Sequence, residues 1–383
     1  MLSKVERIVQ IVREVRAEVG MDLEDLAAAA RVDASVLTAF ETGENSLSTA
    51  KLDRIASALG LDALALLEGQ VLRRPNATAF FRHARVRDFH DQDTDALVAA
   101  LEAGRALLEV NKILARPSSL RGQFKPRDVG PVPYEDGYLA ARQVRVALKN
   151  TGAPLEDLRQ ILEDGFDVAV CSSRLVTHQL LGATVKDGAG AVGVVISAAH
   201  LLSSLAARVT LAHELGHVLL DHAQEDISYV VDIDLLNERR GVDEREQRAR
   251  AFAAEILMPL LGLRKQFGDP LQIDTSGRAL QLVEAARSHF GTPIELAVNH
   301  LMNHGYVHRD DEFRRELIET ERCRPKTSEM QPSDDPAHGL VEPGLSRALL
   351  ERVRKAHELM MITDGRAREL LGLTVADSLP WES

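Results

Sequence analysis

Two histidines and a glutamate in the segment RVTLAHELGHVLLDH have residue types and a spacing suited to metal chemistry. His213 and His217 are four residues apart, so on a helix their rings project from one face, one turn apart. Imidazoles at this spacing can hold one zinc ion, and Glu214 between them can take a proton from water. Because the flanking residues are apolar nearly all round, the helix should be buried. A buried His–Glu–His set without a partner is costly, which favours a metal site over two core histidines.

A third ligand is expected from the next predicted helix, where the candidates are Glu244, Glu246 and Glu255. The apolar face of that helix consists of Ala249, Phe252, Ala253 and Ile256. Glu246 begins the same face, whereas Glu244 and Glu255 fall roughly opposite. We therefore choose Glu246. The alternative is a carboxylate that only stabilises the helix N-terminus through the macrodipole.

HELGH followed by EQRARAFAAEILMP resembles the ImmA/IrrE family of metallo-endopeptidases, which shows HExxH and then E-x-x-A-N-x-F-A-x-x-L-L-M-P. The resemblance covers roughly residues 135–310. It implies that His213, His217 and Glu246 bind one catalytic Zn²⁺ and that Glu214 is the catalytic glutamate. Arg250 departs from the pattern, because the family usually has Asn there. The implied activity is zinc-dependent cleavage of a peptide bond in a regulatory protein.

The N-terminal segment LEDLAAAARVDASVLTAFETGENSLSTAKLDRIASALGL resembles the Xre/Cro-type helix-turn-helix. The resemblance implies helices over residues 23–30, 35–42 and 48–59. The second of these would be the recognition helix, which enters the major groove of DNA. Its hydroxyl-bearing residues, and the basic residues after the module, are the candidate DNA contacts: Ser35, Thr38, Thr42, Arg73 and Arg74.

The charge of this module complicates DNA binding. Residues 1–70 contain 7 Lys/Arg against 12 Asp/Glu, a net charge of −5, and no basic residue lies between Arg31 and Lys51. Asp33, Glu41 and Glu44 are expected at or beside the reading face. Neutralisation of phosphates usually dominates DNA affinity, so binding would be weak without the arginines that follow. Dimerisation or protein docking is the alternative use of the module.

Composition and length indicate several units. The chain has 383 residues, 45% of them hydrophobic, which exceeds one ordinary domain. Residues 167–171 and 192–197 are strand-like, and the other periodic segments are helical. We predict a mainly α fold with a small β-sheet (α+β). Its expected parts are a helix-turn-helix domain (1–70), a basic linker and connecting helix (71–130), a zincin-like metallopeptidase domain (131–265), a helical extension (266–325), a flexible linker (326–343) and a C-terminal helical hairpin (344–383).

Other features exclude several classes of protein. The net charge of −12 argues against a chain-wide polyanion binder, and two distant cysteines exclude both a disulfide scaffold and a cysteine-based zinc ribbon. No apolar run reaches transmembrane length, and the N-terminus lacks a signal-peptide core, so we expect no membrane partner and a cytoplasmic location. His300, His304 and His308 are spaced four apart, but Gly305 interrupts the helix, and we expect surface histidines.

The predicted function is a zinc endopeptidase with one catalytic Zn²⁺, directed to its substrate by the helix-turn-helix. The family resemblance implies a repressor-like, DNA-binding substrate that is cleaved in a stress, phage or mobile-element response. DNA is a second candidate partner, through residues 1–90, and a homodimer is a candidate assembly. The alternative function is an Xre-type transcriptional regulator whose peptidase-like domain is a sensor or scaffold.

Overall fold

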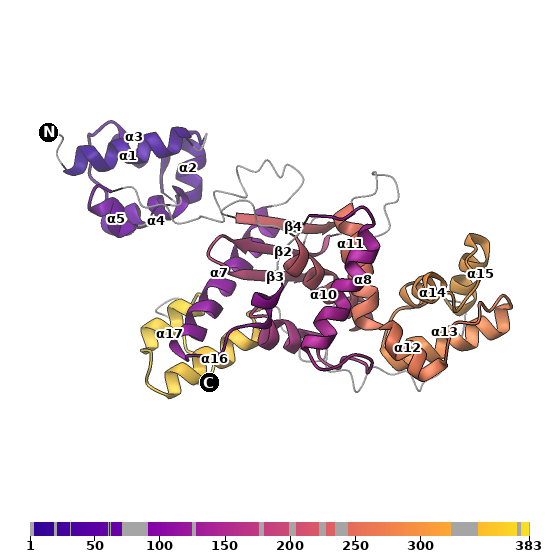
Figure 1. The fold of residues 1–383 in the computed structure, drawn as a ribbon. Coiled ribbons are helices and arrows are strands. Elements are labelled where there is room, and N and C mark those ends of the chain that lie inside the picture. Colours follow the sequence, from indigo (N-terminus) through magenta and orange to yellow (C-terminus); the bar gives the residue numbers. More distant parts are fainter. Residues whose placement is uncertain are drawn as a thin grey trace.

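The arrangement of the helices and strands comes from a computed structural model (Figure 1). It describes residues 4–18, 21–30, 32–59, 61, 63–70, 91–124, 128–175, 180–198, 204–221, 227–233, 244–322, 344–373 and 377–382. Helices dominate the described residues around one small sheet, which confirms the predicted α+β class. None of the helices in this part of the chain is both long enough and apolar enough to cross a membrane.

Five helices share one apolar core in the described N-terminal residues. They are α1 (Lys4–Glu18), α2 (Leu23–Ala30), α3 (Ala34–Glu41), α4 (Thr49–Leu59) and α5 (Ala63–Leu67). Helices α2, α3 and α4 match the three helix-turn-helix segments expected from the sequence to within one residue. Glu41, at the end of α3, accepts two hydrogen bonds of 2.7 Å from the Arg16 guanidinium on α1.

A four-stranded sheet forms the centre of the larger part of the chain. Its strands are β1 (Ala169–Ser173), β2 (Leu180–Asp187), β3 (Val192–Ser197) and β4 (Ile227–Ile233), in the order β1-β3-β2-β4. β1 pairs with β3 in parallel, and the other pairs are antiparallel. The sequence predicted β1 and β3 from their Val- and Ile-rich runs. It did not predict β2, in which Gly182 and polar residues interrupt the apolar pattern, nor β4.

Helices cover both faces of the sheet, and alternate strand residues divide between them. On β3, Val195 faces the cluster that contains α7 (Asp91–Ile113), whereas Val194 and Ile196 face the cluster that contains α10 (Ser204–Leu220). Helices α8 (Pro133–Ala147) and α11 (Glu244–Leu257) pack beside α10. A short α9 (Leu158–Gln160) and a π-helical turn, η2 (Ile161–Gly165), precede β1.

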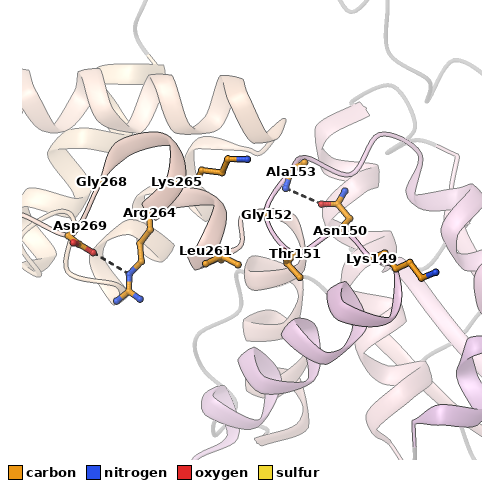
Figure 2. Close-up of a pocket in the computed structure, with 10 residues that line it drawn as sticks. All are labelled: Lys149, Asn150, Thr151, Gly152, Ala153, Leu261, Arg264, Lys265, Gly268 and Asp269. Carbon is orange, nitrogen blue, oxygen red and sulfur yellow. Dashed lines mark hydrogen bonds and ion pairs between the residues drawn. The ribbon is translucent and has the colours of Figure 1, made fainter.

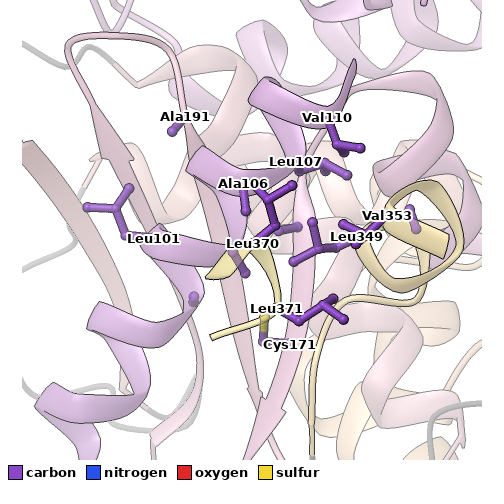
Figure 3. Packing of buried hydrophobic residues seen from close by; sticks show 14 of the residues in the cluster. Leu101, Ala106, Leu107, Val110, Cys171, Ala191, Leu349, Val353, Leu370 and Leu371 are labelled. Carbon is purple, nitrogen blue, oxygen red and sulfur yellow. The ribbon is translucent and has the colours of Figure 1, made fainter. Parts of the chain in front are cut away.

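The face of the sheet opposite α10 is covered by α7 together with the C-terminal helices α16 (Arg347–Glu358) and α17 (Asp364–Leu370). Figure 3 shows Leu107 and Val110 of α7 among Leu349 and Val353 of α16. The sequence predicted α7 as the connecting helix of a linker and α16–α17 as part of a C-terminal helical hairpin. Both contribute to the same buried cluster as the sheet. The exact domain boundaries remain predictions.

Four further helices form the extension after the sheet-bearing part: α12 (Leu260–Phe267), α13 (Ser276–Phe290), α14 (Ile294–Asn303) and α15 (Asp311–Arg322). They have their own apolar core, which Met258 joins from the end of α11. Helix α14 also contacts α11 directly. The extension is therefore attached to the helix that carries the predicted third metal ligand.

Candidate metal centre

Helix α10 places His213, Glu214 and His217 in the interior. The exposed fraction of each residue is 1% or less. Leu211, Ala212 and Leu215 are buried around them, as expected for a helix that is apolar on nearly every side. The two rings lie one turn apart, with their centroids 4.6 Å from each other and their Nε2 atoms separated by 2.9 Å.

Glu246, in the first turn of α11, completes a three-residue cluster. Its Oε2 lies 3.1 Å from His213 Nε2, and its Oε1 lies 3.2 Å from His217 Nε2. Ligand atoms about 2.0–2.1 Å from one tetrahedral zinc ion are separated by about 3.3 Å, so these donors fit one ion of that size. The Glu246 side chain is 21% exposed, whereas both histidines are buried. Solvent therefore reaches the cluster from the side of Glu246.

The other two glutamates considered from the sequence do not join this cluster. Glu244 is exposed at the start of α11. Glu255 lies away from Glu246, as the helical wheel indicated, but it is buried, and its neighbours are His300 and His304. The expectation that these two histidines lie on the surface is wrong for His300, which is 1% exposed, and His304 is largely covered. The packing of α14 on α11 buries all three residues.

Asp221 lies behind His217 and was not identified from the sequence. Its carboxylate contacts His217 Nδ1 and also pairs with the guanidinium of the buried Arg248. A carboxylate on the outer nitrogen of a metal-binding imidazole fixes the tautomer and strengthens the ligand. The spacing between His217 and Asp221, one helical turn, is the signal that was available in the sequence.

These contacts determine the charge state of the cluster. Burial alone would lower the pKa of His217, but hydrogen bonds with the carboxylates of Asp221 and Glu246 raise that pKa to about 10. Burial opposes ionisation of Glu246, yet the hydrogen bonds with His213 and His217 hold its pKa well below the usual range. The arrangement therefore favours positive charge between the imidazoles and the carboxylate, where a cation would lie.

Strand β2 supplies the contacts that position Glu214. Gly182, Thr184 and Lys186 alternate on the face of β2 that faces α10. The Thr184 hydroxyl donates a 2.5 Å hydrogen bond to Glu214 Oε2. A Cβ at Gly182 would lie 3.0 Å from Glu214 Oε1, so this position has no room for a side chain. Lys186 donates to the carbonyl of Asp221, and burial lowers the pKa of its ammonium to about 8.

The candidate DNA contacts lie on the N-terminal helices or outside the described residues. Ser35, Thr38 and Thr42 are exposed on one side of α3 or at its end. The hydroxyls of Thr38 and Thr42 donate to carbonyls of their own helix. Arg73 and Arg74 lie outside the described residues. Glu41 was expected beside the reading face, but its pairing with Arg16 buries it, and it does not add negative charge to that face.

A pocket that Figure 2 shows between α12 and the loop of residues 149–153 contains none of the predicted site residues. Lys149, Arg264 and Lys265 line it, and Arg264 pairs with the exposed Asp269. The metal cluster and this basic pocket are therefore separate features.

Two parts of the chain match known protein families. Residues 163–302 match the model of the peptidase M78 family, described as the IrrE N-terminal-like domain, and residues 12–66 match a helix-turn-helix model. The chain carries an IrrE-like M78 domain and a helix-turn-helix domain. The matched M78 segment includes His213, Glu214, His217 and Glu246, and the matched helix-turn-helix segment includes α2, α3 and α4.

The chain is also similar to a protein that is named for a different activity. It is 27% identical over 226 residues to a 3-ketoacyl-CoA thiolase of Cronobacter sakazakii, a stretch that is 57% of this chain and 53% of that protein. The chain thus matches about half the length of that relative. The M78 family suggests a metallopeptidase, and the helix-turn-helix domain suggests DNA binding.

Proposed function

We propose that this chain is a zinc-dependent endopeptidase whose catalytic ion is held by His213, His217 and Glu246. The observation that carries the proposal is the convergence of these three side chains, whose ligand atoms all lie within 4.8 Å of one another, beside Glu214. Three protein ligands leave one coordination position open, which is typical of catalytic rather than structural zinc sites. The match of residues 163–302 to the M78 family supports the same activity.

Peptide hydrolysis needs an activated water and a proton donor for the leaving amine. When bound, zinc polarises the scissile carbonyl and lowers the pKa of the attacking water. Glu214 acts as the general base: its carboxylate accepts the proton of that water and then donates it to the amine nitrogen as the C–N bond breaks. Thr184 holds Glu214 Oε2 through its hydroxyl, so the carboxylate presents a fixed orientation. Asp221 positions the His217 ring in the same way.

The substrate that we propose is a regulatory protein of the DNA-binding, repressor-like class, cleaved in a stress, phage or mobile-element response. The helix-turn-helix domain brings the peptidase to the repressor or to the DNA that it occupies. Substrates are identified by comparing new protein N-termini in cells that express the wild-type chain with those in cells that express Glu214→Gln. A repressor fragment that appears only with the wild type supports the proposal. Identical N-termini in the two strains would contradict it.

DNA binding by the N-terminal module is a second, separable part of the proposal. Ser35, Thr38 and Thr42 present hydroxyls on an exposed face, and Arg73 and Arg74 supply phosphate contacts. The double variant Arg73→Ala/Arg74→Ala should bind all DNA sequences more weakly and show a shallower dependence of affinity on salt. Thr38→Ala should instead reduce discrimination between sequences. If the wild type, the double variant and Thr38→Ala bind DNA with equal affinity, DNA binding by this module is contradicted. Protein docking would then be its function.

A transcriptional regulator with a non-hydrolytic M78 domain is the second candidate function. The observation that favours it is the burial of Glu41, which leaves less negative charge on the exposed face of α3 than the sequence indicated. The variant Glu214→Gln distinguishes the two candidate functions. If the chain is a regulator of this kind, Glu214→Gln preserves its control of transcription. If it is a peptidase, the variant abolishes that control while DNA binding persists.

Thiol-dependent acyl transfer, which the name of the Cronobacter sakazakii relative would suggest, has little support in the described residues. Cys171 is buried in the cluster between the sheet and α7, and burial raises the pKa of its thiol to about 12. A thiol in this state is neither ionised near neutral pH nor accessible. Cys323 lies outside the described residues.

A further inference from the structure

A second group of metal-binding residue types lies where the helical extension meets α11. Glu255, on α11, and His300, on α14, are each 1% exposed, and His304, one turn after His300, has a side chain that is 10% exposed. Their ligand atoms all lie within 4.8 Å of one another. None of the three belongs to the candidate catalytic cluster.

Two atoms that face each other in this group lack hydrogen bonds. Glu255 Oε2 and His304 Nε2 are 3.3 Å apart and buried, yet neither makes a hydrogen bond with a described residue. The ion pairs of Glu255 with His300 and His304 offset only part of the cost of burying these groups, because neither of the two atoms gains a hydrogen bond. The other oxygen of the carboxylate, Oε1, accepts a hydrogen bond from Arg142 Nε at 2.9 Å. One oxygen of Glu255 is therefore anchored, and the other points to the two imidazoles.

The distances fit a cation shared by the three side chains. Glu255 Oε2 lies 3.4 Å from His300 Nε2 and 3.3 Å from His304 Nε2. Donors of one tetrahedral zinc ion, each about 2.0–2.1 Å from the metal, are about 3.3 Å apart. His300 Nε2 is hydrogen-bonded to the carbonyl oxygen of Met258 at 2.9 Å, and a cation bound by this nitrogen would replace that hydrogen bond. The histidines have the same i, i+4 spacing on α14 that His213 and His217 have on α10.

We propose that Glu255, His300 and His304 form a second binding site for a divalent cation of the zinc class, distinct from the candidate catalytic centre. The site joins α11 to α14. Glu246 and Glu255 lie on the same helix, nine residues and therefore about 13 Å apart along its axis. A cation held by Glu255 fixes the extension to the helix that carries Glu246, and it stabilises the chain without taking part in hydrolysis.

Metal content tests the proposal directly. The purified full chain, saturated with zinc and passed over a desalting column, should contain two zinc ions per chain by elemental analysis. His304→Ala should reduce this to one, and the control His308→Ala, which changes an exposed histidine of the same segment, should leave two. One zinc ion in the wild type, or two in His304→Ala, would overturn the proposal.

A thermal measurement separates this site from the catalytic one. In the double variant His213→Ala/His217→Ala, which lacks the candidate catalytic ligands, added zinc should still raise the midpoint of thermal unfolding. Adding His304→Ala to that variant should abolish the rise. If zinc does not raise the midpoint of the double variant, the cluster is an ion-paired group only, and the proposal fails. Loss of proteolysis in the double variant concerns the catalytic centre and does not bear on this outcome.

Discussion

His217 and Asp221 lie one turn apart on α10, and the carboxylate of Asp221 contacts the Nδ1 atom of His217. The Nε2 atom of the same ring faces Glu246 at 3.2 Å. Because one nitrogen is held by a carboxylate, the other is presented in a fixed direction to the candidate metal position. Asp221 also pairs with Arg248, so the ring is held through a buried chain of polar contacts.

Asp221→Asn should weaken zinc binding by about 10- to 100-fold, because the amide keeps the shape of the carboxylate but removes its charge from the ring. Competition with a chelator of known affinity measures the change. Asp311→Asn alters an exposed carboxylate in the first turn of α15 and serves as the control. An unchanged zinc affinity in Asp221→Asn would show that the contact does not support the metal.

Gly182→Ala should reduce peptide cleavage by about 100-fold, because small displacements of a catalytic group have effects of this order. The new Cβ would lie 2.7 Å from Thr210 Cγ2 and 3.0 Å from Glu214 Oε1, so α10 must move. Gly277→Ala is the matched control, since nothing lies within 4 Å of the Cβ that it adds. Steady-state cleavage rates compare the two. Equal rates would mean that β2 does not position Glu214.

Arg352→Met should lower the free energy of unfolding by about 3–5 kcal/mol, because it leaves buried partners of a charged group without compensation. Arg352 donates to Asn111 at 2.7 Å and pairs with Asp164 and Asp167, so it links α16 to α7 and to the segment before β1. Arg354→Met, on the exposed side of α16, should cost less than about 1 kcal/mol. Denaturant unfolding of both variants tests the difference. Similar losses would contradict the packing of α16 against α7.

Glu41→Gln should destabilise the N-terminal helices by about 1–3 kcal/mol, since it breaks the paired hydrogen bonds with Arg16 and leaves polar groups partly buried. Glu44→Gln removes an exposed charge nearby and should have almost no effect on stability. Thermal unfolding of the full chain measures the loss of stability. Hydrogen exchange of the backbone amides in residues 4–59 shows whether the loss lies in the N-terminal helices. If Glu44→Gln is the more damaging variant, the assigned burial of Glu41 is wrong.

The central ligands were predictable because their signals are local. The four-residue spacing of His213 and His217 determines that they share a helix face, and the apolar face of α11 distinguishes Glu246 from its neighbours. Thr184 could not be found in this way. Its contact with Glu214 joins residues thirty positions apart and depends on how α10 packs across β2, which the pattern of neither segment determines by itself.

The burial of Glu255 shows a second limit of reasoning from one sequence. A helical wheel indicates that Glu255 lies away from the face that carries Glu246, but it does not indicate what covers that side. The packing of α14 buries Glu255 beside His300 and His304. In the same way, the periodicity of α7 predicted a helix but not its partners, which are the sheet and the distant α16.

The zinc content and cleavage rate of Glu214→Gln, measured on the same preparation, test the central claim most directly. The account predicts that zinc content equals that of the wild type, because Glu214 is not a ligand, and that the rate falls by about 10²- to 10⁴-fold, as expected when a general base is removed. Glu244→Gln, which changes an exposed glutamate of α11, should leave both unchanged. Cleavage by Glu214→Gln at a rate close to that of the wild type would contradict the account.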